Sequence, residues 1–268
     1  MANFTEKVVV ITGGSDGIGR ALVQQYLAAG AKVATCGRNA EKLNLLVENF
    51  PSQNLFTQQV NVADELQATA FIEAVIAKWG GIDILINNAG ISMRALVTET
   101  STETLKNVMD INFWGTVYCT KAALKAVQKA NGVIVGVSSI AGYRGLPGRS
   151  GYSASKFALN GWLEALRTEL YNSGTHVMWV CPGFTTSNIR NAALNKNAQA
   201  QGESPMDEGA MMSSEDCAAL IITAIVKRKR SLVLTFTGKR TVFMNKYFPA
   251  WADKLVHGFF FKNGVLVK

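Results

Sequence analysis

The sequence predicts an α/β fold in which a doubly wound parallel sheet lies between two layers of helices. Short runs rich in valine and isoleucine alternate with longer stretches whose apolar residues recur every three or four positions. Runs of the first kind are typical of strands buried on both faces, and their alternation with helices predicts right-handed crossovers. Sheets covered in this way use chains of this length, so we expect one domain over residues 1–268.

The alternation assigns the elements in chain order. The expected strands are residues 7–12, 33–36, 82–86, 133–137, 177–180 and 232–235. The expected helices are residues 18–29, 65–79, 102–130 and 152–172, then one that begins near Ser214 and one that opens at Pro249, since proline fits a first helical turn. Polar residues 185–214 are expected to form a substrate loop or lid, and residues 236–268 an aromatic and basic C-terminal extension.

Composition narrows the class of protein. Hydrophobic residues make up 48% and charged residues 17% of the chain, which excludes a disordered or fibrous protein. The four cysteines are scattered and only two histidines occur, so we expect free thiols and no metal site. We see no signal-peptide pattern and no apolar run of about 18 residues, and therefore expect a cytoplasmic protein. The net charge of +8 predicts a basic surface but no nucleic-acid partner, because no nucleic-acid-binding motif accompanies it.

A glycine turn follows the first expected strand. The segment 12–19 reads TGGSDGIG and leads into a helical pattern. Glycines there permit a tight turn, let backbone N–H groups approach a pyrophosphate, and allow close packing of the helix. The residues assigned to this cofactor contact are Gly13, Ser15, Asp16, Gly17, Ile18 and Gly19.

The TGxxxGxG spacing resembles the short-chain dehydrogenase/reductase family. Further signals follow in the family's order over residues 7–186, namely the segment 87–90 (NNAG), Asn112, Ser139, Tyr152 with Lys156, and the pair Pro182-Gly183. The resemblance implies a Rossmann-type fold and an enzyme that moves hydride between a nicotinamide and a carbonyl or secondary alcohol. It also implies a homodimer or homotetramer formed through the helices 102–130 and 152–172.

The resemblance implies further cofactor contacts. They are Asn88, Ala89 and Gly90, the ribose contact of Lys156 beside Tyr152, and the segment after Pro182 and Gly183, where Thr186 would hold the carboxamide with Thr185 as the neighbouring alternative. At the end of the second strand, Gly37 occupies the position where the family usually has an acidic residue. The planar guanidinium of Arg38, next to it, can pair with a 2′-phosphate. NADP(H) is therefore the expected cofactor, with adenine near Asn61 and Val62, although many members have an acid in place of Asn61.

The catalytic residues are expected on one strand end and one helix. Of the six tyrosines only Tyr152 has a lysine four residues later, Lys156, and this spacing puts both on one helix face. A lysine there would bring the pKa of the phenol toward neutrality. Ser139 follows a strand end, where its hydroxyl can bind a substrate carbonyl. By the resemblance, Asn112 would hold a water of a proton relay, whereas its structural alternative is a buried, hydrogen-bonded side chain.

Substrate contacts are expected from residues 92–96, 143–149 and 206–212 and from Phe184. Their apolar character predicts an apolar, lipid-like substrate, unless the methionines only fill gaps in the packing. The extension 236–268 alternates aromatic with basic residues and is loosely similar to the tails of lipid- and steroid-metabolising members such as 3-ketosphinganine reductase. It can contact an anionic membrane surface, or it can cover the core or a subunit interface.

Two other classes of function compete with an enzyme. A catalytically silent NADP(H)-binding regulator would keep the fold without turnover, and a peripheral membrane scaffold would use only the extension. Both leave the complete set of Asn112, Ser139, Tyr152 and Lys156 unexplained. The sequence therefore favours a carbonyl reductase or alcohol dehydrogenase that acts on a small-molecule substrate.

Overall fold

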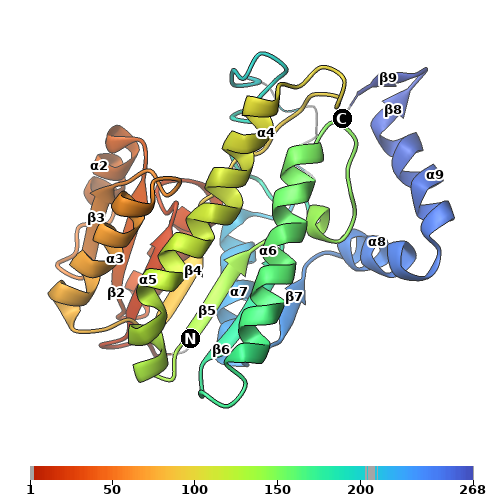
Figure 1. The fold of residues 1–268 in the computed structure, drawn as a ribbon. Helices are drawn as coiled ribbons and strands as arrows, with labels where there is room; N and C mark the ends of the chain where they lie inside the picture. Colours follow the sequence, from red (N-terminus) through yellow and green to blue (C-terminus); the bar gives the residue numbers. More distant parts are fainter. Residues whose placement is uncertain (1–2, 203, 205–208, 210, 268) are drawn as a thin grey trace.

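The computed structural model describes residues 3–202, 204, 209 and 211–267, and its centre is a seven-stranded parallel sheet (Figure 1). The strands lie in the order β3-β2-β1-β4-β5-β6-β7. Their bounds are β1 Val8–Thr12, β2 Lys32–Gly37, β3 Leu55–Gln59, β4 Ile84–Asn87, β5 Val133–Val137, β6 His176–Cys181 and β7 Ser231–Val233. The strand order reverses between β1 and β4, and the predicted doubly wound, Rossmann-type α/β fold is confirmed.

Helices cover both faces of this sheet (Figure 1). Their bounds are α1 Gly17–Ala28, α2 Ala40–Asn49, α3 Glu65–Trp79, α4 Thr102–Met109, α5 Gly115–Lys129, α6 Ser150–Glu169 and α7 Ser214–Val226. Successive strand residues face opposite cores. In β1, Val10 packs on the side of α3, α5 and α6, whereas Ile11 packs on the side of α1 and α7. Because both faces are buried, the central strands are continuous apolar runs.

Within the sheet and the helices that cover it, the structure adds two elements that the apolar pattern did not predict. The strand β3 lies at a sheet edge and is only partly buried, so its sequence, LFTQQ, lacks the valine-rich pattern of the central strands. The helix α2 buries only Leu43 and Leu46. In addition, the π-helical turn Asp110–Trp114 separates α4 from α5 within the expected helix 102–130. Turns of this kind are frequent at functional sites.

The C-terminal extension forms two helices and a short hairpin at one side of the molecule (Figure 1). These are α8 Phe236–Tyr247, α9 Pro249–Phe260, β8 Phe261–Lys262 and β9 Val265–Leu266. The helix α9 opens at Pro249, as the proline predicted. Side chains tie the extension to the loop before α6, since Asn245 donates to the carbonyl of Tyr143 at 2.8 Å and Arg144 contacts both Asn245 and Asp253. In the described part of the chain, no helix has the length and apolar character needed to span a bilayer.

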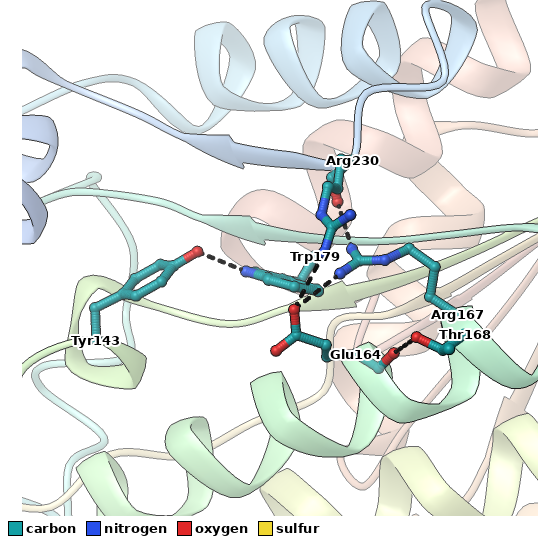
Figure 2. Close-up of polar contacts among 6 residues, drawn as sticks. All are labelled: Tyr143, Glu164, Arg167, Thr168, Trp179 and Arg230. Atoms are coloured by element: carbon teal, nitrogen blue, oxygen red, sulfur yellow. Dashed lines mark hydrogen bonds and ion pairs between the residues drawn. The ribbon is translucent and has the colours of Figure 1, made fainter.

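A polar cluster around Trp179 holds α6 against the sheet (Figure 2). The indole nitrogen of Trp179, on β6, donates to the hydroxyl of Tyr143 at 2.9 Å, and the guanidinium of Arg167, on α6, lies 4.5 Å from the centre of the indole ring. Arg167 also donates to the backbone carbonyl of Arg230, and Glu164 pairs with both arginines. This cluster fixes the orientation of α6, the helix that positions the expected catalytic residues.

Candidate active site

A cavity of about 690 Å³ opens at the carboxyl ends of the parallel strands. Of the residues expected to bind the cofactor or to take part in catalysis, those that line it are Gly13, Ser15, Asp16, Gly17, Ile18, Gly19, Arg38, Asn61, Val62, Asn88, Ala89, Gly90, Ser139, Tyr152, Lys156, Pro182, Gly183 and Thr185. This edge of a doubly wound sheet is the usual ligand position. The cavity is continuous from β2 past the glycine turn to Tyr152 and on to α8 and α9.

The glycine turn is held in place by the segment after β4. The hydroxyl of Thr12 accepts hydrogen bonds from the backbone N–H groups of Asn88 and Ala89, each at 3.0 Å. The side-chain amide of Asn88 donates back to the carbonyls of Thr12 and Gly13 at 3.0 and 3.1 Å. Asn88 therefore shapes the turn through its side chain as well as lining the cavity.

The turn can adopt this compact shape only because two of its glycines lack side chains. Gly13 has a φ of +71°, and a Cβ there would lie 2.9 Å from the Cα of Ala89. A Cβ on Gly19 would lie 2.2 Å from the carbonyl oxygen of Gly13. Asp16 caps α1 by accepting from the N–H of Gly17 at 2.8 Å. The turn thus presents the amino end of α1 to the cavity, and these residues fit the pyrophosphate of a dinucleotide.

Two cations lie at the end of β2. Arg38 is exposed and lines the cavity, and its backbone carbonyl accepts from Gln59 at 3.0 Å. Lys42, on α2, also lines the cavity and pairs with Asp16. Lys42 was not predicted from the sequence because the apolar pattern gives no sign of α2. A helix that begins after Arg38 would have signalled it. Together these side chains place positive charge beside the end of β2, where the chain has Gly37 instead of an acidic residue.

Ser139, Tyr152 and Lys156 meet at the middle of the cavity. Ser139 follows β5, and its hydroxyl forms a hydrogen bond with that of Tyr152 while accepting from the N–H of Ala141 at 3.1 Å. Lys156 is 4% exposed, and its ammonium donates to the carbonyl of Val137 at 2.8 Å and lies 5.7 Å from the centre of the Tyr152 ring. The predicted strand end and helix face therefore come together at one point.

The electrostatics of the tyrosine differ from the sequence-based expectation. Burial raises the pKa of Tyr152, and the influences that lower it are the hydrogen bond from Ser139 and the charges of Arg149 and Arg190. Lys156 is not among these influences. Its own ammonium is desolvated, which lowers the pKa of Lys156 to about 8. The lysine can therefore exchange a proton near neutral pH.

Asn112 lies in the π-helical turn behind the catalytic residues. Its side-chain oxygen accepts from the N–H of Ile91 at 2.8 Å, and its amide donates to the carbonyl of Ile91 and the hydroxyl of Ser155. A Cβ on Gly90 would lie 3.1 Å from that oxygen and 3.6 Å from the Lys156 ammonium nitrogen, so both atoms border the same glycine. Asn112 is therefore a buried, hydrogen-bonded side chain, as the structural alternative predicted. It lies close enough to Lys156 to take part in a proton relay as well.

The substrate end agrees only partly with the expected contacts. Ser92, Leu146, Arg149 and Phe184 line the cavity, whereas Tyr143 turns away to bind Trp179. Thr186 contacts Met212 and Ser214 through its backbone, so Thr185 is the threonine at the cavity wall. Of the stretch 206–212, residues 206–208 and 210 lie outside the described residues. The wall also contains residues that were not assigned to the site, among them Ile189, Arg190, Arg240, Met244, Ala252, Leu255, Val256, Phe259 and Phe260.

Comparison with known proteins gives consistent matches. A family model described as short chain dehydrogenase matches residues 7–198. A mouse protein named dehydrogenase/reductase SDR family member 7B is 32% identical over 256 residues, covering 92% of this chain and 79% of its own length.

Solved structures show the same architecture. A short chain dehydrogenase/reductase from Burkholderia phymatum in complex with NAD has a TM-score of 0.83 at 22% identity and covers 94% of this chain and 96% of its own. An alcohol dehydrogenase from the archaeon Thermococcus sibiricus complexed with 5-hydroxy-NADP has a TM-score of 0.74 at 21% identity, covering 85% and 95%. At these identities the two structures establish the likeness of the fold alone.

The buried lysine predicts a pH-dependent stability. The pKa of Lys156 is about 8 in the folded protein against 10.5 for an ordinary lysine, so between these values the unfolded chain binds a proton that the folded chain lacks. Stability therefore rises with pH across this window. At about 1.36 kcal/mol per pKa unit, the wild-type protein should gain about 3 kcal/mol relative to Lys156→Met between pH 8 and pH 10.5. Urea unfolding of both proteins across that range measures this, and a constant difference between them would contradict it.

Proposed function

The chain belongs to the short chain dehydrogenase family, and from this premise we propose that it is an NADP(H)-dependent oxidoreductase acting on a ketone or secondary alcohol with an apolar body. The observation that carries the proposal is that Ser139, Tyr152 and Lys156 meet in the cavity that the glycine turn also lines. The apolar substrate is supported by the wall that Phe184, Met244 and the apolar side chains of α9 form beyond Tyr152.

The chain's own groups can bind a carbonyl and move its proton. The bound nicotinamide cofactor supplies the hydride in the reducing direction. The hydroxyls of Ser139 and Tyr152, already hydrogen-bonded to each other, converge on one carbonyl oxygen and stabilise its developing charge. Tyr152 gives its proton to that oxygen, and Lys156, with a pKa of about 8, can return a proton toward the phenol. The side chain of Asn112 holds the backbone of Ile91 in place beside these catalytic side chains.

Turnover tests the proposal directly. Oxidation of NADPH, followed by absorbance against ketones from small diketones to long-chain 3-keto lipids, should show a substrate. Tyr152→Phe should lower kcat by about 100-fold or more, because the proton donor is removed. Tyr171→Phe is a matched control, since Tyr171 lies beyond the end of α6 and is 83% exposed. Cofactor binding without turnover across the panel would instead favour a silent NADP(H)-binding regulator.

The preference for NADP(H) is argued from the residues around the end of β2. Both NAD and an NADP derivative occur in solved structures of this fold, so the fold does not choose between them. Gly37 provides no carboxylate for a ribose 2′-hydroxyl, and Arg38 and Lys42 line the cavity there. A phosphate on that ribose would meet the exposed Arg38 guanidinium and the Lys42 ammonium, which also pairs with Asp16, and this favours NADP(H) over NAD(H).

Loss of Arg38 should weaken this preference. In Arg38→Met, the KM for NADPH is expected to rise about 10- to 100-fold, because a charge-assisted hydrogen bond to the phosphate is lost, while the KM for NADH changes little. Arg20→Met removes a guanidinium from an exposed position that does not line this cavity and serves as the control. Equal changes in KM for both cofactors would show that Arg38 does not read the phosphate.

We further propose that the C-terminal extension contacts an anionic membrane surface while its other face covers the cavity. Leu255 and Phe259 line the cavity, but large parts of the extension's aromatic surface are exposed, with Phe236 81% and Trp251 68% accessible. Basic residues accompany them. A surface of this kind binds anionic lipid through apolar burial and charge together.

The four cysteines are free and buried, which supports a reducing, cytoplasmic compartment.

Vesicle sedimentation measures the membrane contact. Trp251→Ser should reduce binding to vesicles containing phosphatidylserine several-fold, because it removes an exposed indole from the extension. Tyr171→Ser, at the far end of α6 and 83% exposed, should leave binding unchanged. Equal sedimentation of all three proteins would remove this part of the proposal.

A homodimer or homotetramer through α5 and α6 completes the proposal. Phe157 of α6 and Trp114, next to α5, are 46% and 43% exposed, which leaves apolar surface for a second copy. Light scattering in solution gives the mass, and a monomer at all concentrations would reject the assembly.

A further inference from the structure

The last two helices form a hairpin whose inner faces line the cavity. A single residue, Phe248, separates the end of α8 at Tyr247 from the start of α9 at Pro249, so the chain turns back on itself there. The lining residues recur at helical spacing, and they are Thr237, Gly238, Arg240, Thr241 and Met244 on α8 and Ala252, Leu255, Val256, Phe259 and Phe260 on α9. One face of each helix therefore borders the same space.

The open end of this hairpin lies at the catalytic residues. Near the start of α8, Gly238 packs against Ile140, the residue after Ser139, so closely that a Cβ there would lie 2.8 Å from the Cδ1 of Ile140. At the end of α9, the ring of Phe260 lies 5.8 Å from the guanidinium of Arg149, which immediately precedes the helix of the catalytic tyrosine. Both helices therefore border the reacting centre at this end.

The other end of the hairpin is closed. Met244 and Ala252 are the lining residues nearest the turn, and Ala252 is 3% exposed. The side chain of Arg144 ties the two helices together there, since its guanidinium donates to the side-chain oxygen of Asn245 on α8 at 3.0 Å and pairs with Asp253 on α9. The space between the helices is thus an arm of the cavity that ends before the turn.

The lining faces set the length and the chemistry of this arm. The wall on α8 runs from Gly238 to Met244 and the wall on α9 from Ala252 to Phe260, which at about 1.5 Å per residue makes them about 9 to 12 Å long. Their side chains are mostly small or apolar, and the charged one, Arg240, is exposed. A narrow apolar space that starts at the catalytic hydroxyls and ends blindly fits an unbranched alkyl chain.

We propose that the α8–α9 hairpin sets the length of the alkyl chain of the substrate, which lies between the two helices with its far end at Met244 and Ala252. The inference rests on the proposed function and names its substrate class, a ketone or secondary alcohol on an unbranched chain of medium length. Ala252 determines this specificity, because its small side chain leaves the space that the last carbons occupy. A ring with the same number of carbons is wider than a chain, and it would have to separate two helices that Arg144 holds together.

A series of methyl ketones from 2-butanone to 2-tetradecanone tests the length, each followed by oxidation of NADPH. In the wild-type protein each added methylene should raise kcat/KM by up to about fourfold, until the gain stops at about ten carbons, where the chain reaches the closed end. Cyclodecanone should have a kcat/KM at least about tenfold below that of 2-decanone. A kcat/KM that does not depend on chain length, or an equal value for ring and chain, overturns the inference and leaves the proposed function intact.

A larger side chain at the closed end should shorten the chain that the arm accepts. In Ala252→Phe the ratio of kcat/KM for 2-decanone to that for 2-hexanone should fall at least about tenfold, because the added ring occupies the space of the last carbons. Ala250→Phe adds the same ring to α9 at an exposed position that does not line the cavity, and it should keep the ratio. An unchanged ratio in Ala252→Phe, or an equal fall in Ala250→Phe, contradicts the inference.

The opposite change does not depend on the folding of Ala252→Phe. Met244→Ala removes a side chain from the closed end, so the maximum of kcat/KM should move toward longer methyl ketones than in the wild-type protein. A maximum at the same chain length in both proteins would show that Met244 does not close the arm.

Binding without turnover separates the inference from the proposed function. Calorimetric titration of 1-hexanol, 1-octanol and 1-decanol requires no hydride transfer. Affinity for the wild-type protein should rise by up to about fourfold per methylene, and this rise should be smaller in Ala252→Phe. That result supports the arm even if no ketone is reduced, and failure of all ketones then counts against the proposed function alone. An equal rise in both proteins, or none in the wild-type protein, overturns the inference.

Discussion

Parallel pairing of the strands is the constraint from which the site follows. When neighbouring strands run in the same direction, their carboxyl ends emerge at one edge, so Thr12, Asn87 and Val137 bring chemically different segments together although they are far apart in the chain. Hydrogen bonds across this edge then fix the geometry. Thr12 joins the glycine turn to the segment after β4, and Lys156 joins α6 to the last carbonyl of β5.

The position of α6 depends on contacts on both sides of the catalytic residues. At its amino end Lys156 is buried and anchored to Val137, and toward its carboxyl end Arg167 stacks on Trp179. A helix held at two separated points has little freedom to rotate, so Tyr152 keeps its hydroxyl beside Ser139. The desolvation that this packing imposes on Lys156 is also what gives the lysine a pKa of about 8. The same burial thus anchors the helix and lowers the pKa of its lysine.

The sequence predicts the parts of the molecule that local patterns specify. The buried strands, the glycine turn and the spacing of Tyr152 and Lys156 are properties of short segments, and each appears at the expected place. The edge strand β3 and the helix α2 have weak apolar patterns because little of their surface is buried, and so they gave no signal. The influences on the pKa of Tyr152 also escaped prediction, since Arg190 reaches that tyrosine only through the folded chain.

The loop before α6 connects the reacting centre with the C-terminal extension. Asn245 and Asp253 bind its residues Tyr143 and Arg144, and the ring of Phe260 lies over Arg149. The extension therefore closes the apolar end of the cavity by holding on to the segment that introduces Tyr152. A displacement of α9 would remove Phe260 from Arg149 and open the cavity beside Phe184 in one step, since Phe184 stacks on Phe259 of the same helix. One helix thus covers both Phe184 and Arg149 at this end of the cavity.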